Sequence, residues 1–244
     1  MTPAGSACQA EAVLQFWFVA CKPRQWFRRS LSFDSVVREQ FGELTAEAVA
    51  GGLSSWEGHP HSALALVLLL DQFSRQVWRD QARAFSGDAR ALALSQRALE
   101  LGWIEAEPAR VRRQFWLMPH LHSEGLAVVE ASVALFERYS DAATAAVAGR
   151  HADWLHRFGR YPHRNAALGR VSTAEEEELL LVRSPGAEAF RCDGCRGTGP
   201  IHYRVRTDLE PQWQLVCPQC WPALREQPGY RYGGTRKANR RQRS

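Results

Sequence analysis

The sequence lacks the signals of membrane and secreted proteins. Its longest uninterrupted apolar run, Ala63 to Leu70, has eight residues, whereas a membrane-spanning helix needs about 20. The first 25 residues have no basic segment ahead of an apolar one and carry Glu11, which argues against a cleaved secretory signal. Together these absences predict a cytoplasmic protein with no membrane partner.

The common catalytic signatures are also missing. The chain contains no Gly-x-Gly-x-x-Gly, no Gly-x-x-x-x-Gly-Lys, no His-Glu-x-x-His and no Gly-x-Ser-x-Gly. The enzyme classes that these motifs define are therefore excluded, and any catalytic site must be built from other residues. Lysine is almost absent as well, because only Lys22 and Lys237 accompany the arginines among 31 basic residues.

The overall composition is that of an ordinary globular protein, but its charge is unevenly placed. Hydrophobic residues make up 45% of the 244 positions and charged residues 23%, which excludes disorder, collagen-like repeats and a disulfide-dense scaffold. Residues 183–244 contain 12 basic and 5 acidic residues, a net charge of +7, against −2 for residues 1–182. This asymmetry predicts an acidic partner for the C-terminal part, either nucleic acid or an acidic protein.

Residues 1–182 have a helical pattern throughout. Apolar positions recur with the 3.6-residue period of an amphipathic helix, and short connections predict about seven or eight helices that pack antiparallel. No fixed repeat is found, although a solenoid-like stack stays open. The expected helices run from a cap at Ser32 to Gly51, over Ala63–Trp78 as a buried central helix, over Asp88–Leu101, from Pro108 to a break at Pro119, from a cap at Ser123 to Tyr139, from Asp141 to Gly159, and over Glu176–Val182 after a Ser172/Glu175 capping box.

The pattern changes after residue 182. Ser184, Pro185 and Gly186 form a linker, and the alternating stretches Ile201–Arg206 and Trp213–Val216 are typical of short strands. The last segment is rich in glycine and arginine and has no apolar period. The predicted domains are therefore a helical domain at 1–183, a β-rich domain at 187–232 and a flexible basic tail at 233–244.

Four cysteines form a metal-binding pattern. Cys192 and Cys195 make one Cys-x-x-Cys pair, and Cys217 and Cys220 make a second. Two such turns across a hairpin complete a tetrahedron of thiolates, which predicts a structural Zn²⁺ in a zinc ribbon. The metal would supply the folding free energy that about 50 residues with few large apolar side chains cannot supply.

Disulfides fit this pattern poorly in a chain without a secretory signal, and a redox site would need a βαβ context. The segment from Cys192 to Gly199 resembles one copy of the repeated element of DnaJ-type zinc centres, which carry four copies, so no cochaperone function follows. The four ligands leave no open coordination position, which favours a structural over a catalytic metal.

Arginine and aromatic residues alternate around these cysteines, a pattern that suits phosphate contact with base stacking. Trp213 and Trp221 are better explained as the small core of the ribbon, whereas for the last segment packing and nucleic-acid contact stay open. The candidate nucleic-acid contacts are Arg204, Arg206, Tyr230, Arg231, Tyr232, Arg236, Lys237, Arg240, Arg241 and Arg243.

Several short motifs of the helical part together resemble the uncharacterised bacterial DUF family 924 over residues 10–182. The motifs are Phe16-Trp17-Phe18, Trp26-Phe27, Asp71-Gln72-Phe73 with Arg75, Arg83-Ala84-Phe85, His122-Ser123-Glu124, and His163-Arg164-Asn165 with Leu168-Gly169-Arg170. Ser74, Gln76 and Gly125 depart from the family pattern, which has Pro, Asn and an acidic residue there. The resemblance implies an all-α fold with a tetratricopeptide-repeat-like helix stack and no assigned activity, and it leaves the cysteine region as an appended domain.

The polar residues of these motifs form a candidate ligand surface. Histidine with carboxylates suits general acid–base chemistry, and arginine binds carboxylate or phosphate. The alternative is structural: Asp71 can pair with a nearby arginine, Ser123 can cap a helix whose positive end favours Glu124, and the segment at His163 can tie a turn to helix ends. The candidate residues are Asp71, Arg75, His122, Glu124, His151, Arg157, His163, Arg164 and Asn165.

The sequence predicts first a binding or scaffold protein with a polar helical surface and a zinc-stabilised basic module. The first alternative is an enzyme that acts on a small anionic substrate in the helical domain. The second alternative is a protein–protein adaptor.

Overall fold

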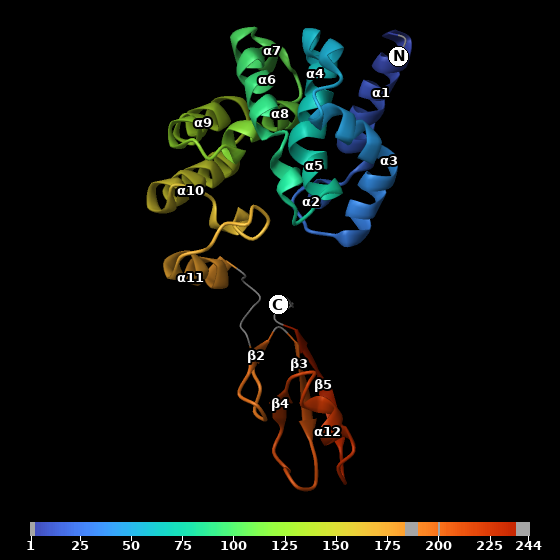
Figure 1. Ribbon diagram of the computed structural model, residues 1–244, viewed down its shortest axis with the longest axis vertical. Coiled ribbons are helices and arrows are strands. Elements are labelled where there is room, and N and C mark those ends of the chain that lie inside the picture. Colours follow the sequence, from blue (N-terminus) through green and yellow to red (C-terminus); the bar gives the residue numbers. More distant parts are fainter. Residues whose placement is uncertain (1–2, 184–189, 200, 238–244) are drawn as a thin grey trace. The chain divides into compact units, whose positions relative to one another are not determined.

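The structure, a computed structural model, describes residues 3–183, 190–199 and 201–237 (Figure 1). The chain divides into two compact units, 1–171 and 172–244. The first unit is helical, and the second contains one longer helix and a small β-rich module. The predicted fold class, a mostly helical chain with a small C-terminal sheet and a cysteine cluster, is confirmed.

The first unit consists of α-helices joined by short 3-10 and π-helical turns. Two π-helical turns, η1 and η3, continue directly from the α-helices before them, so each is a wider, under-wound turn in a longer helical run. In chain order the elements are α1 (Pro3–Gln15), η1 (Phe16–Ala20), α2 (Pro23–Trp26), α3 (Leu31–Val49), η2 (Ser54–Gly58), α4 (Pro60–Val67), η3 (Leu68–Phe73), α5 (Ser74–Val77), η4 (Ala82–Phe85), α6 (Asp88–Glu100), α7 (Trp103–Ala106), α8 (Arg110–His122), α9 (Leu126–Tyr139), α10 (Ala142–Phe158) and η5 (Pro162–Arg164).

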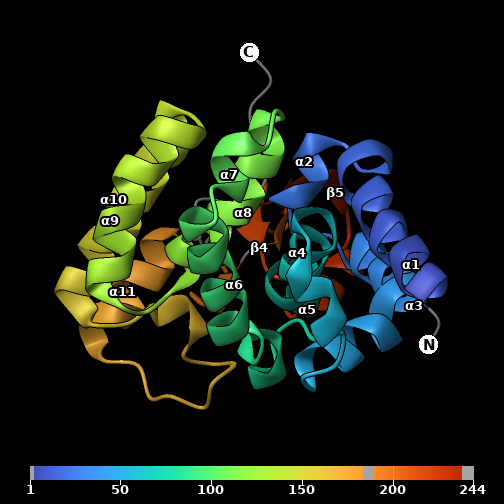
Figure 2. The ribbon, with the colours of Figure 1, turned by 90° about the horizontal axis from the view of Figure 1, so that it is seen from above.

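The run from α4 through η3 to α5 is the centre of this unit. Ala63–Leu70 is buried on every side, as its uninterrupted apolar sequence predicts. Helices α1, α3, α6 and α8 pack against this run. Figures 1 and 2 both show α1 and α3 on one side of it and α9 and α10 on the other. The tetratricopeptide-like arrangement of these helices stays a prediction.

Several helix boundaries differ from the predicted ones because neighbouring residues compete for the same role. Ser30, not Ser32, caps α3, since its Oγ accepts a hydrogen bond from the Phe33 N–H at 3.4 Å. Pro119 does not break α8, which continues to His122. A proline removes one helical hydrogen bond, but the residues around Pro119 are buried in the core and hold the helix together.

The predicted ends of α10 are seen in the structure, whereas the predicted start of α9 is not. Asp141 caps α10 as predicted, accepting from the Thr144 N–H at 2.8 Å, and Gly159 ends it in the left-handed conformation. Helix α9 begins at Leu126 without a side-chain cap, so the predicted cap at Ser123 is wrong. Ser123 instead accepts from the Gly125 N–H at 3.0 Å.

The second unit begins with helix α11 (Ala174–Arg183). Its capping box lies one residue later than predicted: Thr173 Oγ1 accepts from the Glu176 N–H at 3.2 Å, and Glu176 accepts from the Thr173 N–H at 2.8 Å. Thr173 competes with Ser172 for this role, and the reciprocal bond decides between them.

The cysteine module, residues 190–237, follows as a set of short strands. The elements are β1 (Phe190–Arg191), β2 (Thr198–Gly199), β3 (Ile201–Arg206), β4 (Gln214–Val216), α12 (Trp221–Arg225) and β5 (Arg231–Lys237). β1 pairs with β2, and β3 is the central strand between β4 and β5, with both pairings antiparallel. Residues 233–237 belong to β5, in which Thr235, Arg236 and Lys237 pair with β3, so the predicted flexible tail does not begin at residue 233; residues 238–244 lie outside the described part of the chain.

The core of the module is small. Cys192, Val205 and Val216 are buried, with Tyr203, Trp221 and Tyr230 packed partly against them. So little apolar burial cannot by itself stabilise a domain of this length. Among the described helices of the chain, none has the length and hydropathy needed to cross a bilayer.

Candidate active site and candidate metal centre

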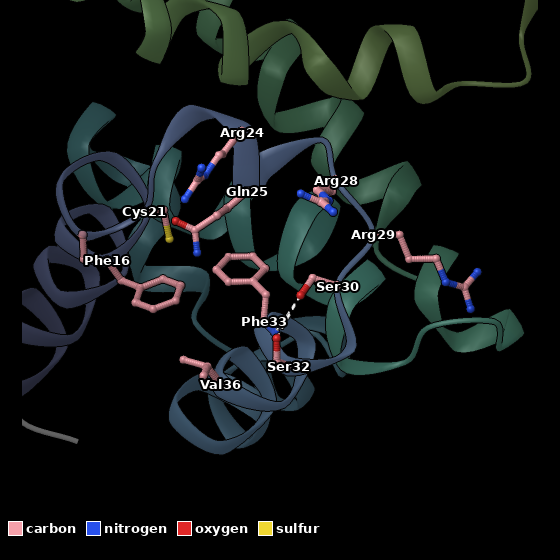
Figure 3. Close-up of a pocket in the computed structure, with 11 residues that line it drawn as sticks. Phe16, Cys21, Arg24, Gln25, Arg28, Arg29, Ser30, Ser32, Phe33 and Val36 are labelled. Carbon is pink, nitrogen blue, oxygen red and sulfur yellow. Dashed lines mark hydrogen bonds between the residues drawn. The ribbon is translucent and has the colours of Figure 1, made fainter. Parts of the chain in front are cut away.

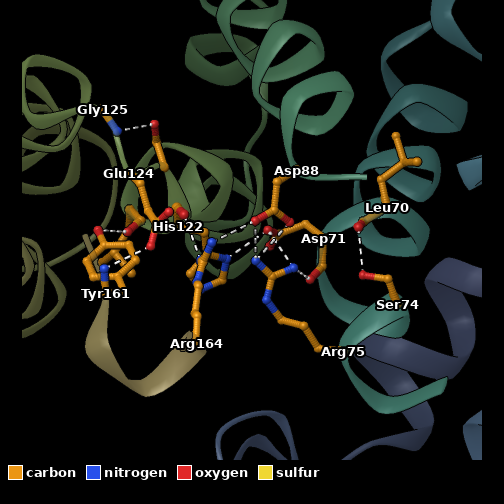
Figure 4. Close-up of polar contacts among 12 residues, drawn as sticks. Leu70, Asp71, Ser74, Arg75, Asp88, His122, Glu124, Gly125, Tyr161 and Arg164 are labelled. Carbon is orange, nitrogen blue, oxygen red and sulfur yellow. Dashed lines mark hydrogen bonds and ion pairs between the residues drawn. The ribbon is translucent and has the colours of Figure 1, made fainter. Parts of the chain in front are cut away.

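A buried carboxylate–histidine pair lies at the centre of the helical unit (Figure 4). Asp71 is on the π-helical turn η3 and is fully buried, and His122 is the last residue of α8. The His122 Nδ1 lies 2.7 Å from Asp71 Oδ1. Because an ionised carboxylate only accepts hydrogen bonds, Nδ1 carries a proton, and in the neutral form of the ring the lone pair is therefore on Nε2.

The His122 side chain lines a cavity of about 390 Å³. Within the described residues, no hydrogen bond joins Nε2 to the protein, and Nε2 is not among the buried atoms that lack a partner. The remaining lining comes from Phe85, Asp88, Ala89, Leu92, Pro119, Ser123, Glu124, Arg164, Leu168 and Arg170. The histidine that Asp71 orients is therefore available to a molecule in this cavity.

The Arg75 guanidinium connects Asp71 to a second carboxylate, Asp88, and the Arg164 guanidinium connects Asp88 to the backbone of His122. The Arg75 Nη1 lies 3.3 Å from Asp71 Oδ1, and its Nη2 lies 3.0 Å from Asp88 Oδ1. The Arg164 Nη1 lies 3.1 Å from Asp88 Oδ2, and its Nη2 donates to the His122 carbonyl at 2.7 Å. Both guanidiniums also lie over the Phe85 ring, at 4.6 Å for Arg164 and 5.5 Å for Arg75.

The electrostatics of this network keep Asp71 ionised. Burial by itself raises the pKa of Asp71, but the charges of His122 and Arg75 and the hydrogen bonds from His122 and Gln72 outweigh it and hold the pKa well below its usual value. Burial raises the pKa of Asp88, and the charge of Asp71 adds to this. Burial likewise lowers the pKa of Arg164. The carboxylate that orients His122 therefore stays charged.

A second ion pair forms another wall of the cavity. Arg170 donates to both oxygens of Glu124 at 2.9 and 2.8 Å, and the Tyr161 N–H donates to Glu124 Oε1 at 2.8 Å. Burial alone would raise the pKa of Glu124, but the bonds from Arg170 and Tyr161 lower it. The interpretation that Glu124 stabilises a helix end is therefore wrong, because the carboxylate is bound by a different segment.

The structure brings together five of the nine predicted ligand-surface residues: Asp71, Arg75, His122, Glu124 and Arg164 are in the network or line the cavity. The other four lie beside it. The His151 Nδ1 is 3.2 Å from the Leu121 carbonyl, and the rings of His151 and His163 pack on Tyr161. Arg157 lies over Phe158, and Asn165 is buried in the turn that follows η5.

Sequence reasoning missed three residues of this site: Asp88, Arg170 and Tyr161. The sequence indicates Asp88 only as the first residue of a helix and Arg170 only as part of a family motif. The one sequence feature that could have indicated a role for Asp88 is the glycine before it, Gly87. A Cβ at Gly87 would lie 2.6 Å from the Leu70 carbonyl, so only glycine lets α6 begin directly against η3.

The four cysteines of the second unit converge as predicted from their spacing. Their sulfur atoms all lie within 4.8 Å of one another, and the Cys195 and Cys217 sulfurs are 3.8 Å apart. Burial raises the pKa of Cys192, but hydrogen bonds from the backbone at Cys195, Cys217 and Gly194 outweigh it and lower the pKa to about 6. The four cysteines could therefore hold a metal ion.

Turns in the backbone hold both Cys-x-x-Cys pairs in place. The Cys192 N–H donates to the Gly197 carbonyl at 2.8 Å, and the Arg196 N–H donates to the Cys192 carbonyl at 2.9 Å. In the second pair the Cys220 N–H donates to the Cys217 carbonyl at 3.1 Å. The two turns therefore place four sulfur atoms where they could surround one metal ion.

The predicted nucleic-acid residues lie mainly on β3 and β5. The guanidiniums of Arg204 and Arg206 lie 4.8 and 5.0 Å from the Trp213 ring. Trp213 is 39% exposed, so its assignment to the core of the ribbon is wrong, whereas Trp221 does pack there. Tyr230 is partly buried, and its hydroxyl accepts from Trp221 Nε1 at 2.9 Å.

The remaining predicted contacts follow the last strand. Arg231, Tyr232 and Arg236 are exposed on β5. The backbone of Lys237 ends that strand, while Arg240, Arg241 and Arg243 lie outside the described residues. The exposed contacts therefore share the sheet that presents Trp213.

The molecule thus combines a helical domain that has a charged internal site with a small four-cysteine domain. Residues 13–184 match the family model described as bacterial protein of unknown function (DUF924), and residues 191–239 match a domain of unknown function (DUF8622). The chain belongs to the DUF924 family, which confirms the resemblance seen in the sequence, and its cysteine module is a separate appended domain.

The comparison with solved structures supports the same assignment. The chain is similar to a protein of unknown function from Agrobacterium tumefaciens at 32% identity, with a TM-score of 0.67. The match covers 72% of this chain and 98% of that one. Among curated proteins, no significant match to this chain is found.

Proposed function

We propose that the helical domain is an enzyme domain in which His122 moves a proton on a small polar substrate held in the 390 Å³ cavity. The observation that carries this proposal is the 2.7 Å contact between His122 Nδ1 and the buried Asp71, with Nε2 unbonded within the described residues. A buried carboxylate on one ring nitrogen orients the other nitrogen and stabilises the imidazolium that forms when it accepts a proton.

Arg75 has a positioning role in this scheme. Its guanidinium lies between Asp71 and Asp88 and keeps the Asp71 carboxylate ionised. The proton that His122 receives therefore stays on Nε2, from which it can return to a leaving group. His122 acts first as a base on a bound hydroxyl or water and then as an acid.

The charge balance of the site indicates what charge the substrate has. Each guanidinium of the network already pairs with a carboxylate: Arg75 with Asp71 and Asp88, Arg164 with Asp88, and Arg170 with Glu124. An anion would have to compete with these carboxylates. We therefore propose proton transfer on a polar substrate as the main activity, and any anionic group on that substrate would contact Arg164 and Arg170.

A model ester tests this proposal. Hydrolysis of p-nitrophenyl acetate by the full chain should fall to the background rate in His122→Ala and fall strongly in Asp71→Asn. His156→Ala is the matched control, because His156 Nε2 pairs with Glu130 at 2.7 Å on the exposed surface. A rate unchanged in His122→Ala, or lowered equally in His156→Ala, would contradict the proposal, provided that circular dichroism shows folded variants.

For the cysteine module we propose a structural zinc ion. Four thiolates and no open position are the ligand set that zinc takes in structural sites. The support is the convergence of the four sulfurs within 4.8 Å. Elemental analysis of the purified chain should find one zinc per molecule, with loss of that zinc in Cys217→Ser and full retention in Cys8→Ser, since Cys8 lies outside the cluster. Another metal in stoichiometric amount would overturn the assignment to zinc.

A second function is favoured by one observation on the same module. Arg204 and Arg206 are held over the exposed Trp213 ring, which restricts two guanidiniums before any partner arrives. We propose that this face contacts the phosphates of nucleic acid, and an acidic protein is the alternative partner. The positive charge of the C-terminal part supports either partner.

Fluorescence anisotropy with labelled single- and double-stranded RNA and DNA tests this contact. Binding by the full chain should weaken steeply with salt and should be lost in Arg204→Gln/Arg206→Gln, while Arg97→Gln/Arg150→Gln, which removes the same charge from the helical domain, should bind normally. Absence of binding at low salt would overturn the nucleic-acid proposal. Capture of a protein partner that is insensitive to salt and depends on the helical domain would favour an adaptor.

A further inference from the structure

A second cavity of the helical unit lies away from His122 and has a volume of about 510 Å³ (Figure 3). The π-helical turn η1, helix α2 and the first turns of α3 enclose it. The lining residues are Phe16, Ala20, Cys21, Arg24, Gln25, Arg28, Arg29, Ser30, Ser32, Phe33 and Val36. Its size is in the range of pockets that hold small organic ligands.

The inner side of this cavity is apolar. The Phe16 and Phe33 rings are stacked with their centroids 6.1 Å apart, and Val36 and the buried Cys21 extend this surface. Burial raises the pKa of Cys21 to about 11, so its thiol is neutral and packs as a small apolar group. An aliphatic or aromatic group would be well accommodated there.

The outer side of the cavity is cationic. Among the described residues, neither the Arg24 nor the Arg28 guanidinium has a carboxylate partner, and no acidic residue lines the cavity. Arg29 forms an exposed pair with Asp80 at 2.5 Å and extends away from the aromatic rings in Figure 3. The Ser30 and Ser32 hydroxyls add polar contacts. This positive charge is uncompensated, in contrast to the paired guanidiniums around His122.

Exposed apolar side chains are concentrated in the same segment. Val19, Phe27 and Leu31 are 70%, 63% and 72% exposed, and each is adjacent in sequence to a residue that lines the cavity. Val36, which lines it, is 39% exposed. Exposed apolar groups beside a pocket add to the apolar surface that a ligand can contact. The cavity and its surroundings therefore combine apolar area with unpaired positive charge.

We infer that this cavity binds a free amphipathic organic anion, an aliphatic chain with a carboxylate head. The chain packs on Phe16, Phe33 and Val36, and the carboxylate accepts hydrogen bonds from Arg24 and Arg28, whose planar guanidiniums match its geometry. The site is separate from the proposed active site, and its occupancy does not depend on His122 or Asp71.

The probe for this site is 1-anilinonaphthalene-8-sulfonate, which combines an aromatic body with one negative charge and fluoresces when bound in apolar surroundings. The full chain should bind it with saturation, and decanoate should displace it. Decanol, which has the same chain without the charge, should displace it about tenfold less effectively or worse, because it gains no charge-assisted hydrogen bonds.

Substitutions show whether the probe binds in this cavity. Arg24→Gln/Arg28→Gln should weaken probe affinity about tenfold or more, whereas Arg97→Gln/Arg150→Gln, which changes the net charge equally on exposed positions elsewhere, should leave it unchanged. Ala20→Trp should block the cavity and abolish displaceable binding. His122→Ala should bind the probe normally, so that failure of the active-site proposal and failure of this one are distinguishable.

Three results would overturn the inference. The first is equal probe affinity in the two double variants. The second is equal displacement by decanol and decanoate, since the arginines would then contribute nothing. The third is co-sedimentation of the chain with phosphatidylglycerol vesicles without any displacement by decanoate, which would make this face a membrane-contacting surface. Thermal unfolding of each variant, followed by circular dichroism, separates loss of binding from loss of fold.

Discussion

His120 is a buried titratable group that the proposed mechanism does not use. It lies on α8 and is 4% exposed, and within the described part of the chain its Nε2 has no hydrogen-bond partner. Burial lowers its pKa to about 4, because the charged imidazolium cannot be solvated there. The folded protein therefore favours the neutral ring more strongly than the unfolded chain does.

This lowered pKa predicts a pH-dependent stability. The contribution of His120 is fully present above pH ~6.5, the value for an unfolded histidine, and is lost as the pH falls toward 4. The loss amounts to about 3 kcal/mol at most. Urea unfolding of the wild-type chain should show this decline between pH 6.5 and 4.

The matching variant is His120→Phe, which cannot take up a proton. Its free energy of unfolding should change much less over the same pH range than that of the wild type. His156→Phe serves as the control, because His156 is on the surface and should leave the pH dependence as it was. Equal pH dependence of the wild type and His120→Phe would contradict the assignment of this loss of stability to His120.

At the scale of elements, the contact between α6 and η3 assembles the acidic half of the candidate active site. Gly87 precedes Asp88, and its α-carbon faces the Leu70 backbone, the residue before Asp71. Two carboxylates from separate helices reach the same arginine only because these two backbones touch. The π-helical geometry of η3 contributes as well, because it offsets Asp71 from the register of the α-helix before it.

Gly87→Ala tests this contact. The added Cβ would lie 2.6 Å from the Leu70 carbonyl, so α6 must move away from η3. We expect destabilisation of about 1–3 kcal/mol in urea unfolding, together with slower hydrolysis of the model ester as Asp88 moves from Arg75.

Gly149→Ala provides the control on a second helix. Gly149 is inside α10, and a Cβ there meets nothing within 4 Å. This variant should gain about 0.5–1 kcal/mol from helix propensity. Destabilisation of both variants, or of neither, would show that the contact between Gly87 and Leu70 does not determine the effect of Gly87→Ala on stability.

At the scale of the whole molecule, the two compact units have different sources of stability. The helical unit buries a large apolar core around Ala63–Leu70, whereas among the described apolar side chains of the cysteine module only Cys192, Val205 and Val216 are fully buried. A bound metal would therefore supply most of the free energy of the second fold and little of the first.

Removal of the metal should accordingly unfold one part of the chain. In differential scanning calorimetry of the full chain, a strong chelator should abolish the transition of the cysteine module and leave the unfolding temperature of the helical unit unchanged. Amide resonances of residues 190–237 should collapse to unfolded positions at the same time. A shift of both transitions together would mean that the units depend on each other for stability.

Patterns among residues close in sequence predicted most of the fold. The 3.6-residue period of apolar positions, the cap at Asp141 and the spacing of the two Cys-x-x-Cys pairs all act between residues close in sequence, and each is seen in the structure. Where two neighbouring residues could cap the same helix, as with Ser30 and Ser32 or Ser172 and Thr173, the local pattern did not distinguish them. The hydrogen bonds to the first turn of each helix identify the cap.

Sequence by itself determined the helical class, the family and the cysteine cluster, because periodicity and ligand spacing are short-range properties. Only the tertiary structure decided which polar groups meet. Asp71 contacts His122 across 51 positions, and Asp88 contacts Arg164 across 76. The sequence likewise could not predict that Arg24 and Arg28 have no carboxylate partner among the described residues. The folded structure shows this, because it places the acidic groups elsewhere. Charge pairing in a folded protein depends on distance in space, and distance along the chain does not predict it.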